Sequence, residues 1–153
     1  MKDSTFHEDM MLLALEEANK AEILGEVPVG AIAVIQGEVI GKGHNLCINS
    51  LDPSAHAEIC TLKQAAYHQK NYRLNGVNLY VTLEPCMMCA AFLVHARIDH
   101  LYFGTFDEKS GAIISQARFL EEGYLNHKVK YEGGILAKEC SEILINFFSN
   151  KRS

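Results

Sequence analysis

The sequence predicts an α/β fold, a three-layer α/β/α sandwich in which a five-stranded mixed sheet is flanked by helices. Short apolar runs alternate along the chain with amphipathic stretches, and helix-length segments separate the last three runs. Strands connected in this way lie parallel, with right-handed crossovers. The chain has 153 residues, of which 48% are hydrophobic. That is enough for one compact core, so we expect a single domain over residues 1–153.

The first half of the chain predicts a helix, a hairpin and a second helix. Apolar residues recur at helical spacing from His7 to Leu24. Residues 29–35 and 38–41 are typical of strands, and the Gln36-Gly37 pair between them suits a tight turn. After a polar loop, Asp52-Pro53-Ser54 signals the beginning of a helix of about four turns.

The second half alternates strands with helices. Pro85 is typical of the first turn of a helix, so it indicates where one of them begins. The apolar segments predict strands at 78–82, 100–104 and 129–131, and helices at 86–96, 115–121 and 137–148. Helices that follow parallel strands begin at one edge of the sheet, so we expect the functional groups to gather there.

Charge and cysteine content exclude several classes of protein. The chain carries 14 Lys plus Arg against 19 Asp plus Glu, a net charge of −5. This charge argues against a protein that coats nucleic acid through its overall positive charge. No apolar run approaches the roughly 20 residues that span a bilayer, so we expect no membrane association. Five cysteines, an odd number lying mostly in apolar segments, favour reduced thiols in the cytoplasm or metal ligands over disulfides.

Two short fragments carry the chemistry: His56-Ala57-Glu58 and Pro85-Cys86-Met87-Met88-Cys89, each at the beginning of a predicted helix. Cys-x-x-Cys at a helix N-terminus places both sulfurs on one face, where the helix dipole favours thiolates that bind one metal ion. With His56 as the third ligand, a tetrahedral zinc keeps one position open for water. Glu58 is then placed to take a proton from that water and return it to a ring nitrogen.

Other interpretations of the same fragments stay open. A redox dithiol is one, although the intervening Met-Met pair is unlike the usual dithiol sites. A structural zinc site is another, with Cys47, Cys60, Cys140 or a further histidine as the fourth ligand. A zinc-stabilised RNA-binding scaffold would leave Glu58 without a function. If the protein is an enzyme, its zinc chemistry asks only for an amine on an electrophilic ring carbon. Free cytosine, cytidine and guanine meet that requirement as well as a base in RNA does.

The spacing His56-x-Glu58 followed by Pro85-Cys86-x-x-Cys89 matches the signature of the zinc-dependent cytidine deaminase-like superfamily. Nearly the whole chain is similar to the tRNA-specific adenosine deaminase (TadA) family. The segments that carry this similarity include Glu26-Val27-Pro28-Val29-Gly30, Asp52-Pro53-Ser54-Ala55-His56, Asn71-Tyr72-Arg73-Leu74, Leu79-Tyr80-Val81-Thr82-Leu83-Glu84 and Phe147-Phe148.

The resemblance implies a single zinc-dependent deaminase domain of cytidine deaminase-like fold, acting as a homodimer. Its expected reaction is hydrolytic deamination of the wobble adenosine in a tRNA anticodon loop to inosine. A base in such a loop is already unpaired and is extruded into a pocket at modest cost. Carried over by position, His56, Cys86 and Cys89 bind one Zn²⁺ per subunit, and Glu58 shuttles protons.

Substrate contacts follow from the same resemblance. Asn45 is expected to hydrogen-bond the target base, and Val27 and Phe148 to form the pocket wall. Asp107 follows a predicted strand, where loops that contact substrates gather, so we predict that it binds substrate.

The chain departs from the family pattern at two places near these contacts. Leu46-Cys47 replaces a basic residue and a proline, and Phe106 stands where arginine is common. Loss of an arginine weakens phosphate binding, whereas Phe106 either stacks on a base or packs within the protein.

Overall fold

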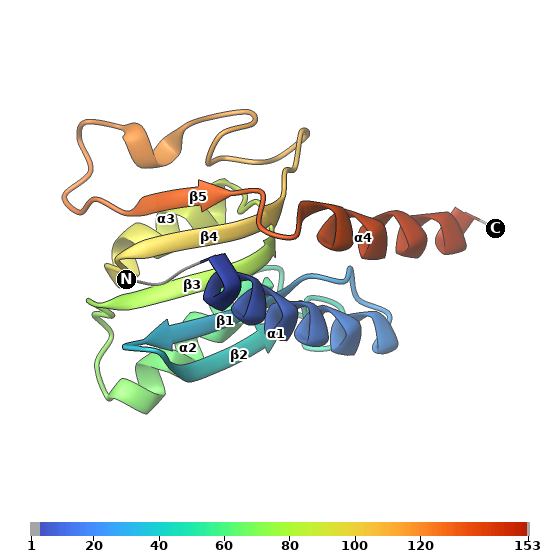
Figure 1. Ribbon diagram of the computed structural model, residues 1–153, viewed down its shortest axis with the longest axis horizontal. Helices are drawn as coiled ribbons and strands as arrows, with labels where there is room; N and C mark the ends of the chain where they lie inside the picture. Colours follow the sequence, from blue (N-terminus) through green and yellow to red (C-terminus); the bar gives the residue numbers. More distant parts are fainter. Residues whose placement is uncertain (1–3, 153) are drawn as a thin grey trace.

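The computed structural model describes residues 4–152 and arranges them around one central sheet (Figure 1). The elements are α1 (Ser4–Ile23), β1 (Gly30–Ile35), β2 (Glu38–His44), α2 (Ala57–Gln69), β3 (Val77–Leu83), α3 (Met87–Ala96), β4 (His100–Thr105), η1 (Phe119–Glu121), β5 (Lys130–Gly133) and α4 (Ala137–Arg152).

The five strands form a mixed sheet in the order β2-β1-β3-β4-β5. β1 is antiparallel to both β2 and β3, whereas β3, β4 and β5 are mutually parallel. The predicted hairpin beside a parallel run is therefore confirmed. β2 is longer than predicted and ends at His44, because its pairing with β1 continues as far as Gly30, across a register shift between Ala33 and Val34.

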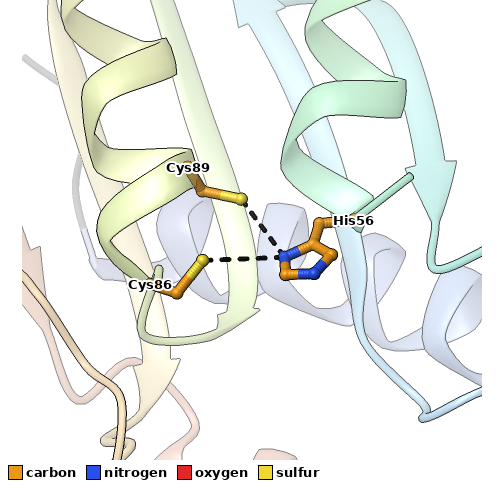
Figure 2. Close-up of side chains that lie close together, drawn as sticks. All are labelled: His56, Cys86 and Cys89. Carbon is orange, nitrogen blue, oxygen red and sulfur yellow. Dashed lines mark hydrogen bonds between the residues drawn. The ribbon is translucent and has the colours of Figure 1, made fainter. Parts of the chain in front are cut away.

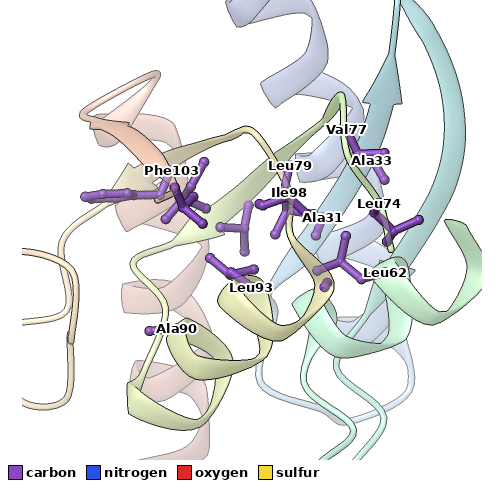
Figure 3. Packing of buried hydrophobic residues seen from close by; sticks show 14 of the residues in the cluster. Ala31, Ala33, Leu62, Leu74, Val77, Leu79, Ala90, Leu93, Ile98 and Phe103 are labelled. Atoms are coloured by element: carbon purple, nitrogen blue, oxygen red, sulfur yellow. The ribbon is translucent and has the colours of Figure 1, made fainter. Parts of the chain in front are cut away.

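Helices cover both faces of the sheet, which confirms the three-layer sandwich. Successive strand side chains point to opposite faces: Ala31 and Ala33 pack in the larger apolar cluster, and Ile32 and Val34 pack in the smaller one. The larger cluster lies beneath α2 and α3 (Figure 3), and the smaller one includes Met11 of α1. In Figure 1, α1 lies in front of the sheet and α2 and α3 lie behind it.

Two of the predicted helices differ from those observed. The helix predicted at 115–121 is only the single 3₁₀ turn η1, because the Phe119 amide donates to the Ala112 carbonyl, seven residues earlier, and not within a helical turn. The backbone amides of residues 113–115 donate to the Glu84 carboxylate and hold the preceding segment as a loop. The helix predicted from Asp52 begins at Ala57, because the Asp52 carboxylate accepts hydrogen bonds from Ser54 and closes a turn of its own. Between residues 4 and 152, no helix is long and apolar enough to cross a membrane.

The fold brings five chain segments to one edge of the sheet. They are the segment before β1, the segment after β2, the N-terminus of α2, the connection from β3 to the N-terminus of α3, and the segment after β4. This edge is the one toward which the arrowheads of β2 and β5 point in Figure 1. Residues before β1, after β2 and after β4 therefore lie close to the helix beginnings that carry the predicted chemistry.

Candidate active site

His56, Cys86 and Cys89 come together from two helix N-termini (Figure 2). His56 is the N-cap residue of α2, and Cys86 is the N-cap residue of α3. The His56 Nδ1 atom lies 3.7 Å from Cys86 Sγ and 3.4 Å from Cys89 Sγ. All three potential ligand atoms lie within 4.8 Å of one another. The two sequence fragments, 30 residues apart at His56 and Cys86, thus form one cluster.

The spacing of these atoms fits a tetrahedral zinc ion. Zinc–sulfur and zinc–nitrogen bonds of ordinary length, at tetrahedral angles, separate a thiolate sulfur from an imidazole nitrogen by roughly 3.6 Å. The two distances from His56 Nδ1 agree with that value. Within residues 4–152, no other His, Cys, Asp or Glu joins this group, so Cys47, Cys60 and Cys140 do not complete a four-ligand structural site.

The local electrostatics favour an anionic sulfur in the cluster. A hydrogen bond from the Cys89 thiol lowers the pKa of Cys86, and His56 acts in the same direction. The hydrogen bond with Cys86 in turn raises the pKa of His56. Peptide dipoles at the N-terminus of α3 also stabilise negative charge there. A thiolate beside an imidazole is the donor set that a divalent zinc ion prefers.

Glu58 lies beside the cluster without belonging to it. Its side chain, in the first turn of α2, is only 4% exposed and contributes to the same cavity as His56 and Cys86. Burial raises the pKa of the Glu58 carboxyl to about 7. A carboxyl group with a pKa near neutrality both accepts and donates protons readily, which suits acid–base chemistry.

A cavity of about 360 Å³ opens beside these groups. It is large enough for a nucleobase and is lined by residues of all five segments at the sheet edge. Val27, Asn45 and Asp107, three of the residues predicted to bind substrate, lie in its wall. The other lining residues are Glu26, Val29, Cys47, Ile48, His56, Glu58, Leu83, Glu84, Cys86 and Ser110.

Phe148, the fourth predicted substrate contact, lies outside this cavity. It lines a separate groove of about 280 Å³ together with Phe106 and residues of α4. The reason is the course of α4, whose C-terminal half extends beyond the sheet (Figure 1). Phe106 is 42% exposed and packs edge-on against Phe103, at 5.1 Å between ring centroids, so it combines a packing contact with an accessible ring.

The sequence alone assigns no function to two buried carboxylates in the cavity wall. Glu26, 2% exposed, accepts hydrogen bonds from the backbone amides of Ile48 and Asn49 and from the Asn49 side chain. Glu84, also 2% exposed, accepts hydrogen bonds from the loop after β4. Each acid therefore holds one loop of the cavity rim. The available signal was a glutamate inside an otherwise apolar segment, which is uncommon without a buried partner.

Relatives of known function place the chain among enzymes. A tRNA-specific adenosine deaminase of Haemophilus influenzae is 50% identical over 150 residues, which cover 97% of this chain and 87% of that protein. The chain belongs to the tRNA-specific adenosine deaminase family. Another family member, from Aquifex aeolicus, is 45% identical over 95% of this chain and 96% of its own length. The MafB19-like deaminase family model matches residues 5–152.

Solved structures agree with the assignment to the deaminases. One, from studies of A-to-I editing by tRNA:A34 deaminases at the wobble position of transfer RNA, has a TM-score of 0.86 and 43% identity. The match covers 89% of this deaminase and 99% of that chain. A guanine deaminase from Nitrosomonas europaea has a TM-score of 0.81 at 19% identity, over 93% of this chain and 84% of its own. At that identity the likeness shows a shared fold alone.

Proposed function

We propose that this deaminase converts the wobble adenosine of a tRNA anticodon loop to inosine by hydrolysis. The observation that carries the proposal is the cavity in which Glu58 stands beside the His56, Cys86 and Cys89 cluster. The 50% identity to a tRNA-specific adenosine deaminase points to the substrate. We further propose that residues 1–153 form one deaminase domain, which is supported by the family match over residues 5–152.

His56, Cys86 and Cys89 would hold a zinc ion, one per subunit, because their ligand atoms have the spacing and chemistry that zinc requires. Zinc in such a site acts as a Lewis acid that lowers the pKa of water toward neutrality. Two thiolates and a neutral imidazole balance the charge of the metal, so the cavity does not acquire a large net charge when it is loaded.

Glu58 moves the protons of the reaction. Its carboxylate accepts a proton from the attacking water and delivers it to the ring nitrogen beside the reacting carbon. The oxygen of water bonds to the ring carbon first. The remaining proton of that water then passes to the exocyclic amine, and the carbon–nitrogen bond breaks to release ammonia. Water and adenosine are thus converted to inosine and ammonia with no oxidant or reductant. The buried position of Glu58 keeps bulk water from competing for these protons.

The cavity wall would orient the base. Asn45 donates a hydrogen bond through its Nδ2 group, since its Oδ1 atom already accepts one from the Ala57 amide. Val27 provides apolar surface, and Asp107 lies at the rim, where it meets the ribose or a neighbouring nucleotide. Phe148 and Phe106 line the adjacent groove, where a flanking base of the anticodon loop would stack.

We also propose that the enzyme is a homodimer in the cytoplasm. The family resemblance supports the dimer. The free cysteines at 47, 60, 86, 89 and 140 are compatible with a reducing compartment.

The decisive experiment supplies purified, zinc-loaded protein with an anticodon stem-loop that carries adenosine at the wobble position. Free guanine, cytidine and adenosine are supplied in parallel, and Glu58→Ala serves as the inactive control. Inosine formed from the stem-loop alone, and absent with the variant, supports the proposal. Ammonia released only from a free base or nucleoside would overturn the RNA assignment while retaining the deaminase chemistry.

A further inference from the structure

We propose that Glu84 is a positioning residue that orders the loop between β4 and η1 for binding of the anticodon loop. The inference rests on the proposed function for the identity of the RNA. It concerns a residue that is not part of the metal cluster, and that acts through Asp107 and Ser110 at the cavity rim.

Both oxygens of the Glu84 carboxylate are saturated by the loop. Oε1 accepts hydrogen bonds from the Asp107 amide at 3.0 Å and from the Ser115 hydroxyl. Oε2 accepts from the amides of Ile113 at 3.2 Å, Ile114 at 2.8 Å and Ser115 at 2.9 Å. The bonds reach both ends of the segment from 107 to 115, so a single carboxylate fixes the whole loop.

Residues 84–86 join this loop to the metal cluster. Glu84 lies two residues before Cys86, and its own amide donates to the Thr105 carbonyl at 2.9 Å. The Pro85 carbonyl accepts from the Ala112 amide, also at 2.9 Å. The loop is therefore held against the Pro85-Cys86 turn on both sides, and its distance from the cluster is set by these bonds.

The rim residues themselves are shaped by this arrangement. The Asp107 carboxylate accepts from the amides of Lys109 and Ser110, and its carbonyl accepts from the Gly111 amide. The backbone of Gly111 packs directly against the Glu84 carboxylate, so that a Cβ atom at residue 111 would lie 2.3 Å from Glu84 Cδ. Only glycine allows the backbone this close to the carboxylate. The tight turn that presents Asp107 and Ser110 thus depends on the buried acid.

Glutamine at this position is a specific disruption. The side chains of Glu and Gln have nearly equal volume, but the amide group replaces one acceptor oxygen with two N–H donors. At Glu84 that group would face the backbone amides of the loop, donor against donor. The loop would lose its anchor without the creation of a cavity.

The test compares Glu84→Gln with Glu17→Gln. Glu17 is another buried glutamate, 4% exposed, whose partners His44 and Lys20 lie away from the active-site cavity. Zinc content, hydrogen exchange of the amides of residues 107–115, and kcat and KM for the wobble-adenosine stem-loop are measured for both variants and the wild type.

We expect Glu84→Gln to keep its zinc, to exchange the loop amides faster, and to raise KM about tenfold with kcat changed by less than about threefold. Glu17→Gln should leave both loop exchange and KM at wild-type values. A Glu84→Gln variant that is destabilised yet has the wild-type KM would overturn the inference, because the acid would then serve stability alone.

Ser115→Ala provides a second test of the inference if Glu84→Gln does not fold. It removes one donor to Oε1 and leaves the other bonds in place. A raised KM in that variant supports the inference, and an unchanged KM contradicts it. Failure of the wild-type enzyme on the stem-loop would instead refute the proposed function, so the two failures are distinct.

Discussion

The side-chain oxygen of Asn45 accepts a hydrogen bond from the backbone amide of Ala57, at 2.8 Å. Asn45 directly follows β2, and Ala57 stands between His56 and Glu58 at the beginning of α2. The first amides of a helix have no partner within the helix, so this bond satisfies one of them. It also ties the hairpin to the helix turn that carries two functional side chains.

Substitution of Asn45 should separate its two functions. Asn45→Asp keeps the oxygen acceptor for Ala57 and removes the Nδ2 donor, so we expect a near wild-type melting temperature and a raised KM for the stem-loop. Asn45→Ala removes both groups and should also lower the free energy of unfolding by about 1 kcal/mol, the usual effect of losing a helix cap. Thermal denaturation and steady-state kinetics test both variants. Equal melting temperatures for Asp and Ala variants would contradict the capping function.

Glu58→Gln should abolish most turnover while leaving the site otherwise intact. The substitution conserves volume in a side chain that is only 4% exposed, but it cannot accept and return protons. We expect kcat to fall by about 10²- to 10⁴-fold, the usual contribution of acid–base catalysis. Zinc content and affinity for the stem-loop should stay near wild type. A variant with normal kcat would exclude Glu58 as the proton shuttle.

Metal content should depend on Cys86 and not on Cys60. Cys86→Ser removes a ligand atom from the cluster, whereas Cys60→Ser changes a half-buried thiol of α2 that lies outside it. Elemental analysis of the purified proteins should give one zinc per chain for the wild type and for Cys60→Ser. Cys86→Ser should contain much less. Equal zinc contents in the two variants would argue against the proposed ligand set.

Acid should remove the stability that Glu84 contributes. Burial opposes its ionisation, but hydrogen bonds from Ser115, Ile114 and Asp107 outweigh burial and hold the pKa of Glu84 below its ordinary value of 4.5. A group whose pKa is lower in the folded state stabilises the protein above its unfolded pKa and loses that contribution as the pH falls through the folded pKa. Urea denaturation below about pH 4.5 should therefore show a steeper loss of stability for wild type than for Glu84→Gln. If the free energy of unfolding falls equally with pH in the wild type and in Glu84→Gln, the Glu84 carboxylate is not the source of this loss of stability.

Gly30→Ala should be strongly destabilising because α1 crosses β1 at this residue. A Cβ atom at Gly30 would lie 2.1 Å from the Ala14 carbonyl oxygen and 2.4 Å from the Ala18 amide nitrogen, both backbone atoms. Such overpacking typically costs about 1–3 kcal/mol. Gly123→Ala is the matched control, since nothing lies within 4 Å of the added Cβ. Chemical denaturation of both variants measures the difference, and similar stabilities would contradict the close approach.

Regular patterns in the sequence predicted most of the fold. The apolar run in residues 29–35 predicts β1, and the helical spacing from His7 to Leu24 predicts α1, whose observed bounds are Ser4–Ile23. Connections of helix length also predict the parallel run of β3, β4 and β5, because handedness and chain length leave few other arrangements. The cluster of His56, Cys86 and Cys89 was predicted from spacing at two helix beginnings.

Interactions between distant residues explain what the sequence did not predict. The segment 115–121 has helical periodicity, yet the amides of residues 113–115, at and before its beginning, bind a glutamate 29 to 31 residues earlier in the chain. No local pattern reveals that a particular carboxylate will be buried and saturated by backbone donors. The same holds for Phe148, whose distance from the cavity follows from the direction of α4 and not from its own neighbours in sequence.

The cluster that joins the beginnings of α2 and α3 also has a consequence for the unfolded chain. His56 and Cys89 are separated by 33 residues, and closing a flexible loop of that length costs entropy before any contact is gained. An ion held by both helices acts as a removable cross-link, and its binding energy adds to the folding free energy. Loss of the proposed zinc ion should therefore lower the free energy of unfolding as well as the activity.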